Sequence, residues 1–165
     1  MDYRIESILG EAYQNIIKNK ETEISLRVKA VRLMGEHLKD TRVREYLFFI
    51  VNPRGEEYPT MVKAEAIRAL EPLVPDDKGV VSVLKRKIRA KEQSIRDAAA
   101  EVLSVRLGQG EWERVFGDLL RDTSPENVWT KDQNALMDIM SLRWEEKRRH
   151  EELAEILAAL KKHLP

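Results

Sequence analysis

The sequence contains no cysteine, and this absence excludes several kinds of chemistry. Without a thiol the chain can form no disulfide, no thiolate nucleophile and no cysteine-ligated metal site. The three histidines, His37, His150 and His163, are scattered, and no His-x-x-x-His motif or phosphate loop accompanies them. No serine is placed to complete a triad with His37 and Asp40. We therefore predict no catalytic residue, no metal site and no cofactor.

The sequence also lacks an excess of charge of one sign and a long apolar run. Lys and Arg together number 29, and so do Asp and Glu; nucleic-acid binders usually carry a basic excess, so this balance argues against that partner. The longest aliphatic and aromatic run, Tyr46 to Val51, is far shorter than the roughly 20 residues that span a bilayer. The opening MDYRIESILG does not resemble a signal peptide. We expect a cytoplasmic protein without a membrane partner.

Glycine, proline and aromatic residues are scarce, and strand patterns are weak throughout. Apolar residues instead recur with i, i+3, i+4 spacing, which is typical of amphipathic helices. The spacing predicts an all-α chain of about nine helices, with separate helices over Ala135–Leu142 and Leu153–Leu160 at the end. Short polar breaks separate the other helices, at 19–22, 39–41, 52–59, 74–77, 108–110 and 122–127.

Three of the predicted helices carry the same apolar frame, opening at Leu26, Val62 and Ile95 with offsets of 36 and 33 residues. Because one helix pair cannot bury its own apolar face, such copies are expected to stack and share a core. A small fifth residue lets a neighbouring helix approach, and a large ninth residue fills the layer between pairs. The second position holds Arg27, Lys63 and Arg96, the fifth Ala30, Ala66 and Ala99, the eighth Leu33, Ala69 and Val102, and the ninth Met34, Leu70 and Leu103. A degenerate fourth copy places Ala135 and Ile139 in the fifth and ninth positions.

The segment LRVKAVRLMGEHL, Leu26 to Leu38, resembles the second helix of short bacterial HEAT-repeat proteins, approximately V-R-x-x-A-x-x-A-L-G-x-L, including Gly35. VKAEAIRALEPL and IRDAAAEVLSVRL are similar but lack the glycine. The resemblance implies a right-handed, armadillo-like α-solenoid of about four to five antiparallel helix pairs in a single domain over 1–165. A cap helix would cover 1–19, the repeats 20–142 and a second cap helix 143–165. The alternative fold is a plain helical bundle in which the three similar helices are coincidental.

The same resemblance implies that each repeated cation bonds to an acidic residue in the turn before its helix. The acids available in this sequence are Glu21 or Glu23 for the first copy, Glu57 for the second and Glu92 for the third.

In a solenoid of this type the second helices line the concave face, so we predict a non-catalytic protein–protein interaction module, an adaptor or scaffold that binds another protein or peptide. The predicted partner-binding residues are Lys29, Arg32, Glu65, Arg68, Asp97 and Glu101 on that face, with Trp129 and Trp144 as exposed anchors. The other candidate surface is the basic stretch Lys85 to Arg96, which could grip phosphates or an acidic partner.

Two alternative functions follow from the same family resemblance. The chain could be an accessory subunit of a bilin lyase-type enzyme. It could also be a nucleic-acid-binding protein similar to the HEAT-like alkylation-repair glycosylases, with Asp97 as the acid, although Glu65 and Glu101 make the same strip acidic.

Overall fold

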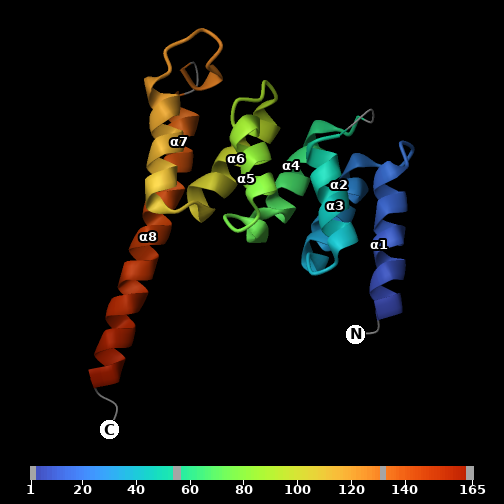
Figure 1. Cartoon of the computed structure of the whole chain (residues 1–165), viewed down its shortest axis with the longest axis horizontal. Coiled ribbons are helices and arrows are strands. Elements are labelled where there is room, and N and C mark those ends of the chain that lie inside the picture. Colours follow the sequence, from blue (N-terminus) through green and yellow to red (C-terminus); the bar gives the residue numbers. More distant parts are fainter. Residues whose placement is uncertain (1–2, 54–56, 131–132, 163–165) are drawn as a thin grey trace. The chain divides into compact units, whose positions relative to one another are not determined.

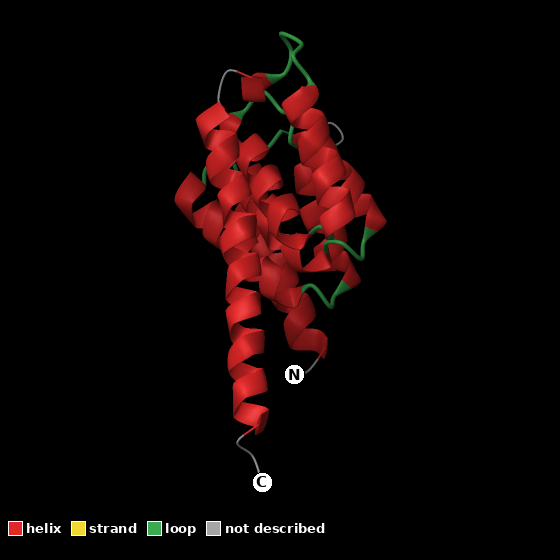
Figure 2. Ribbon diagram, turned by 90° about the vertical axis from the view of Figure 1, so that its left-hand side faces the viewer, coloured by secondary structure: helices red, strands yellow, loops and turns green. Residues whose placement is uncertain are grey.

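The computed structural model describes residues 3–53, 57–130 and 133–162, in which every regular element is a helix (Figures 1 and 2). The predicted all-α class is therefore confirmed. The chain divides into two compact units, residues 1–108 and 109–165.

The first unit contains six α-helices, and their positions match the helices expected from the apolar spacing. They are α1 (Tyr3–Lys18), α2 (Ile24–Met34), α3 (Thr41–Val51), α4 (Thr60–Ala69), α5 (Lys78–Lys87) and α6 (Gln93–Arg106), with short 3₁₀ turns at Gly35–His37 and Glu71–Leu73. Aspartates define two of the starts. Asp40 immediately precedes α3, and its carboxylate accepts a hydrogen bond from the backbone N–H of Arg42. Asp77 immediately precedes α5, and its carboxylate accepts hydrogen bonds from the backbone N–H groups of Gly79 and Val80.

The helices of this unit pack in a regular order along the chain. α2 lies between α1 and α4, and α4 also packs against α6, while α3 packs on α4 and α5 on α6 (Figure 1). The three similar helices α2, α4 and α6 are therefore successive neighbours, each in contact with the next.

The repeated small and large positions account for these contacts. The fifth-position alanines Ala30, Ala66 and Ala99 and the ninth-position residues Met34, Leu70 and Leu103 are all buried. The sixth position, which the frame did not include, is buried in all three helices as well, by Val31, Ile67 and Ala100. The fifth, sixth and ninth positions are thus the ones at which all three helices contribute to the shared core.

The prediction that the first and eighth positions of the repeated pattern are buried was wrong for α2. Leu26 is 49% exposed and Leu33 is 41% exposed, whereas Val62 and Ile95, at the first position of the later copies, are buried. The buried stripe of α2 runs instead through Arg27, Ala30, Val31 and Met34. Because this stripe is displaced by about one residue, Leu26 and Leu33 lie at its edge.

Gly35 explains how closely the end of α2 approaches α4. A Cβ atom added at Gly35 would lie 3.0 Å from the Cβ of Ala69, tighter than ordinary van der Waals contact. The backbone of Gly35 is right-handed, with φ −60° and ψ −18°, so any L-residue could adopt it. The glycine is therefore explained by space and not by backbone conformation.

The repeated arginines are buried, but the first does not find its expected partner. Nε of Arg27 donates to the backbone carbonyl of Ile17 at 2.8 Å, in place of Glu21 or Glu23. Ile17 lies in the last turn of α1, where carbonyls have no partner within the helix, so it offers a ready acceptor. In α6, Nε of Arg96 lies 3.7 Å from Oδ1 of the adjacent Asp97.

The second unit contains α7 (Gln109–Arg121), a 3₁₀ turn at Val128–Thr130 and α8 (Gln133–Lys162). α8 is one helix of 30 residues, so the prediction of two helices here was wrong. The intervening stretch RWEEKRRHEE contains neither glycine nor proline and is rich in good helix formers, so nothing in it ends the helix. Position 142, the expected end of the repeats, lies inside α8.

Candidate protein-interaction site

Ion pairs join the exposed edges of α2, α4 and α6. Nε of Arg32 in α2 donates to Oε1 of Glu65 in α4 at 2.9 Å. A guanidinium nitrogen of Arg68 in α4 lies 3.6 Å from a carboxylate oxygen of Glu101 in α6. Four of the predicted partner-binding residues therefore pair with one another. We call these two pairs the charge ladder.

A third pair extends the contact between α4 and α6 at the ends of these helices. Nε of Arg106 lies 3.4 Å from Oε1 of Glu71, and both side chains are partly exposed. Because all these pairs are open to water, each is expected to contribute little to stability. Their effect is to order the charges on this face.

The remaining predicted residues of the face lie close to the ladder. Lys29 is exposed on α2, on the same helical stripe as Leu26, Leu33 and Glu36. Asp97 is half-buried beside Arg96. On α4, Met61 is 61% exposed. This face, formed by the exposed residues of α2, α4 and α6, therefore carries apolar side chains beside ordered charges, and we call it the ladder face.

Trp129 is not an exposed anchor, and that expectation was wrong. Its side chain is 1% exposed. The loop before it is held by buried Asn127, whose Nδ2 donates to the carbonyls of Leu119 at 2.9 Å and Asp122 at 2.7 Å. Oδ1 of Asn127 accepts from the backbone N–H of Trp129 at 3.3 Å, so Asn127 holds the backbone on both sides of the turn that carries the buried indole. Trp144 lies within α8, and its side chain is outside the described residues.

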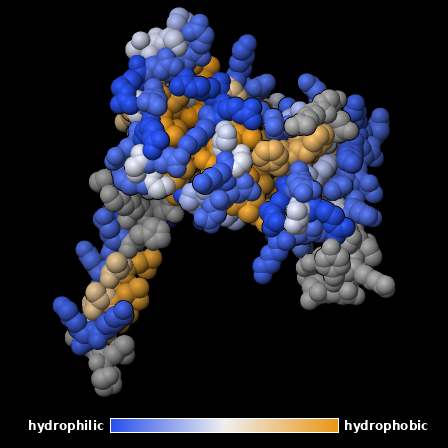
Figure 3. All heavy atoms as spheres, in the orientation of Figure 1, coloured by the Kyte–Doolittle hydropathy of each residue, from blue (hydrophilic) through white to orange (hydrophobic). Residues whose placement is uncertain are grey.

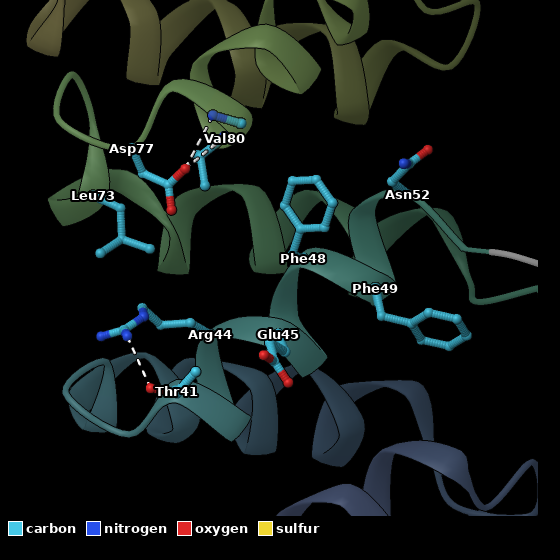
Figure 4. Close-up of a pocket in the computed structure, with 10 residues that line it drawn as sticks. Thr41, Arg44, Glu45, Phe48, Phe49, Asn52, Leu73, Asp77 and Val80 are labelled. Atoms are coloured by element: carbon cyan, nitrogen blue, oxygen red, sulfur yellow. Dashed lines mark hydrogen bonds between the residues drawn. The ribbon is translucent and has the colours of Figure 1, made fainter.

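A groove between α3 and α5 was not anticipated from the sequence. It has a volume of about 920 Å³. Its apolar lining comes from Phe48 and Phe49 of α3, Leu73 and Val80. Figure 4 shows Phe48 pointing from α3 toward the segment that carries Val80, while Phe49 points away from it. Phe49 packs edge-to-face with Tyr58, with ring centroids 6.3 Å apart.

Several polar groups of this groove already have hydrogen-bond partners within the protein. Arg44 donates to the Leu38 carbonyl at 2.7 Å and to the Thr41 hydroxyl at 3.0 Å. Asp77 caps α5. The groove therefore presents mainly apolar surface to a ligand. The sequence did hint at it, because Tyr46 to Val51 is apolar throughout and one helix face cannot bury six successive residues.

The basic stretch Lys85 to Arg96 forms the end of α5 and the start of α6. Partial burial, followed by the positive charges of Lys63 and Arg86, lowers the pKa of Lys87, and the charge of Glu92 opposes this shift. Lys63 of the second repeat is thus close to Lys87. Of these cations, Lys85, Arg86 and Lys87 lie in the last turn of α5, where positive charge favours the helix dipole.

The described residues contain no group of three or more His, Asp or Glu side chains arranged to hold a metal ion. Among the helices that the structure describes, none has a stretch long and apolar enough to cross a membrane. Comparison of the chain with known protein families, curated proteins and solved structures gave no match.

Proposed function

We propose that the chain is a non-catalytic protein–protein interaction module whose first unit is a HEAT-like, right-handed α-solenoid. The ladder face is its docking surface, and the partner is an amphipathic helix of another protein. The successive packing of α2, α4 and α6 and the burial of their repeated alanines support the repeat arrangement.

The observation that carries the proposal is the exposure of two leucines on the ladder face. Leu26 and Leu33 lie one above the other on α2, and each is more than 40% exposed. Lys29 lies between them in the sequence, and Glu36 follows on the same stripe. A partner helix with apolar residues at i, i+3 and i+7 would cover the leucines, and an acid beside them would meet Lys29.

The ladder adds order to this surface. A charge that is already held by an intramolecular pair loses less side-chain entropy on binding than a free one. Arg32 and Glu65 therefore place a fixed pair of charges between the exposed leucines of α2 and helix α4.

The experiment begins with affinity capture from the native lysate and identification of the partner. The purified partner is then titrated against wild-type protein, Leu33→Asp and the matched control Leu120→Asp, an exposed leucine of α7. We expect Leu33→Asp to weaken binding at least about tenfold and Leu120→Asp to leave it unchanged. Equal affinity of all three proteins would refute the ladder face as the docking surface.

The alternative functions stay predictions, and each has a direct assay. Nucleic-acid binding predicts a gel shift at low salt that fades steeply as salt is added. A role in a bilin lyase predicts bilin binding or transfer to an acceptor subunit. A positive result in either assay, together with unchanged partner binding in Leu33→Asp, would replace our proposal.

A further inference from the structure

The C-terminal part of α8 carries an apolar stripe that is open to solvent. Its members are Leu153, Ile156, Leu157 and Leu160, each 56–57% exposed. Their i, i+3, i+4, i+7 spacing places them on one face of the helix. The beginning of α8, by contrast, buries Leu136 and Ile139 within the second unit. Figure 1 shows α8 continuing past the N-terminal end of α7, and Figure 3 shows apolar side chains on the projecting part.

The sequence of this part has a two-fold pattern. From Glu151 to Lys162 it reads E-E-L-A-E-I-L-A-A-L-K-K. The four apolar residues of the stripe are placed symmetrically about the midpoint between Ile156 and Leu157. The ends are symmetric in position and opposite in charge, because two glutamates open the segment and two lysines close it.

The stability of α8 itself does not explain the acidic pair. Glutamates favour the first turn of a helix, where they complement its dipole. Glu151 and Glu152 lie well inside a helix that begins at Gln133. Among the side chains that the structure describes in this part of α8, Oε1 of Glu152 lies 3.8 Å from Nε of Arg148, and both side chains are more than 60% exposed, so this pair holds the glutamate weakly.

We propose that this segment, Glu151 to Lys162, is a self-association surface that pairs α8 antiparallel with α8 of a second copy of the chain. A two-fold axis between Ile156 and Leu157 sets Leu153 level with Leu160 of the second copy, so the two apolar stripes cover each other. It also sets the acidic end of each segment level with the basic end of the other. A parallel pair would bring like charges together at both ends.

Two further features fit a closed dimer of this kind. An isologous contact uses the same patch on both copies, so no apolar surface is left to recruit a third chain. Antiparallel helices also oppose their dipoles, which favours this orientation over the parallel one. The proposal uses the second unit alone and does not depend on the ladder face.

The first test is the mass of the full chain by sedimentation equilibrium at concentrations up to about 0.1 mM. We expect a monomer–dimer equilibrium in the wild type. Leu157→Asp should raise its dissociation constant at least about thirty-fold, with unchanged helical circular dichroism. Met137→Asp is the control, since Met137 is 60% exposed on α8 outside the segment, and it should dimerise like the wild type.

Charge reversal tests the direction of the pairing. Lys161→Glu with Lys162→Glu, and separately Glu151→Lys with Glu152→Lys, should each weaken the dimer several-fold. The fourfold variant restores opposite charges at both ends and should recover wild-type association. Weakening followed by recovery is specific to the antiparallel pair. In a parallel pair, the wild type, both double variants and the fourfold variant would all place like charges opposite each other.

A distance measurement tests the same point independently. The natural chain has no cysteine, so Glu145→Cys provides a single site for a spin label. In the antiparallel dimer the two labels are 23 residues apart along the helix direction, or roughly 35 Å at a rise of 1.5 Å per residue. A parallel dimer would bring them within roughly 15 Å, somewhat more than the spacing of packed helices.

Several outcomes would overturn the proposal. A wild type that remains monomeric at the highest concentration lacks the contact. A dimer that persists in Leu157→Asp uses another surface. A short label distance, or failure of the fourfold variant to recover, contradicts the antiparallel arrangement. A monomer whose segment is covered by a different protein would assign the stripe to that protein.

Discussion

Nε of Arg32 lies 2.9 Å from Oε1 of Glu65, and this pair connects two helices whose sequences resemble each other. The two residues are 33 positions apart. The next pair, Arg68 and Glu101, connects α4 to α6 in the same way. A charge pattern that looks like an ordinary solvated surface in the sequence is thus a set of contacts between neighbouring helices of similar sequence.

The ladder should make a small and salt-sensitive contribution to stability. In a double-mutant cycle of Arg32→Ala and Glu65→Ala, we expect a coupling of about 0.2–1 kcal/mol by urea unfolding, because Arg32 is 64% exposed. The coupling should shrink when salt is raised to about 1 M. A coupling that is absent at low salt, or that grows with salt, would contradict the pairing.

Enlarging Gly35 should push α2 away from α4. Gly35→Val is expected to destabilise the protein by about 1–3 kcal/mol, because its side chain would collide with Ala69. The double variant with Ala69→Gly removes the colliding methyl group and should lose less than the sum of the two single changes. Strict additivity in urea unfolding would show that the two residues do not touch.

Asp40 should make stability depend on pH at the acid end. Burial of its carboxyl raises the pKa, but hydrogen bonds from the backbone and side chain of Arg42, together with its charge, outweigh this and hold the pKa below the usual 3.8. A folded-state pKa below the unfolded value means stability that is fully present above pH 3.8 and lost as the pH falls through the folded pKa.

Two variants separate the charge of Asp40 from its role as a helix cap. Asp40→Ala should lose about 0.5–2 kcal/mol at neutral pH, whereas Asp40→Asn, which still caps, should lose much less. The small difference between the wild type and Asp40→Asn should shrink as the pH falls below 3.8 and vanish once the pH is below the folded-state pKa. If that difference instead increases on acidification, the pKa shift has the wrong sign.

The ninth and eighth positions of the frame should respond differently to truncation. Leu103 is fully buried, so Leu103→Ala is expected to cost about 2–5 kcal/mol. Leu33 is 41% exposed, so Leu33→Ala should cost less than about 1 kcal/mol. Comparable losses for the two variants would mean that Leu33 is part of the core after all.

The sequence predicts the helices of the first unit and their buried alanines well because both depend on local spacing. The burial of Ala30, Ala66 and Ala99 follows from their common place in the frame. The exposure of Leu33 does not, because it depends on how α2 is rotated against its neighbours. The rotation is set by contacts far apart in the sequence, such as Arg27 with the Ile17 carbonyl.

The surface features were predicted less well, for the same reason. Arg32 and Glu65 look like free charges until α2 and α4 are placed side by side. Trp129 looks exposed in a polar loop, but the loop is held by buried Asn127 and the indole is buried. Phe48 is expected in the core from its sequence, but in the structure it lines the groove between α3 and α5. In each case the deciding partner lies in another element or across a turn.

The central claim is that the ladder face binds another protein, and photo-crosslinking in the native cell tests it most directly. A benzophenone amino acid is placed at Lys29 on that face or, as a control, at Glu45 beside the groove between α3 and α5. We predict one crosslinked partner from position 29 and none from position 45. A partner captured only from position 45, or equally from both, would contradict the claim and move the binding site away from α2.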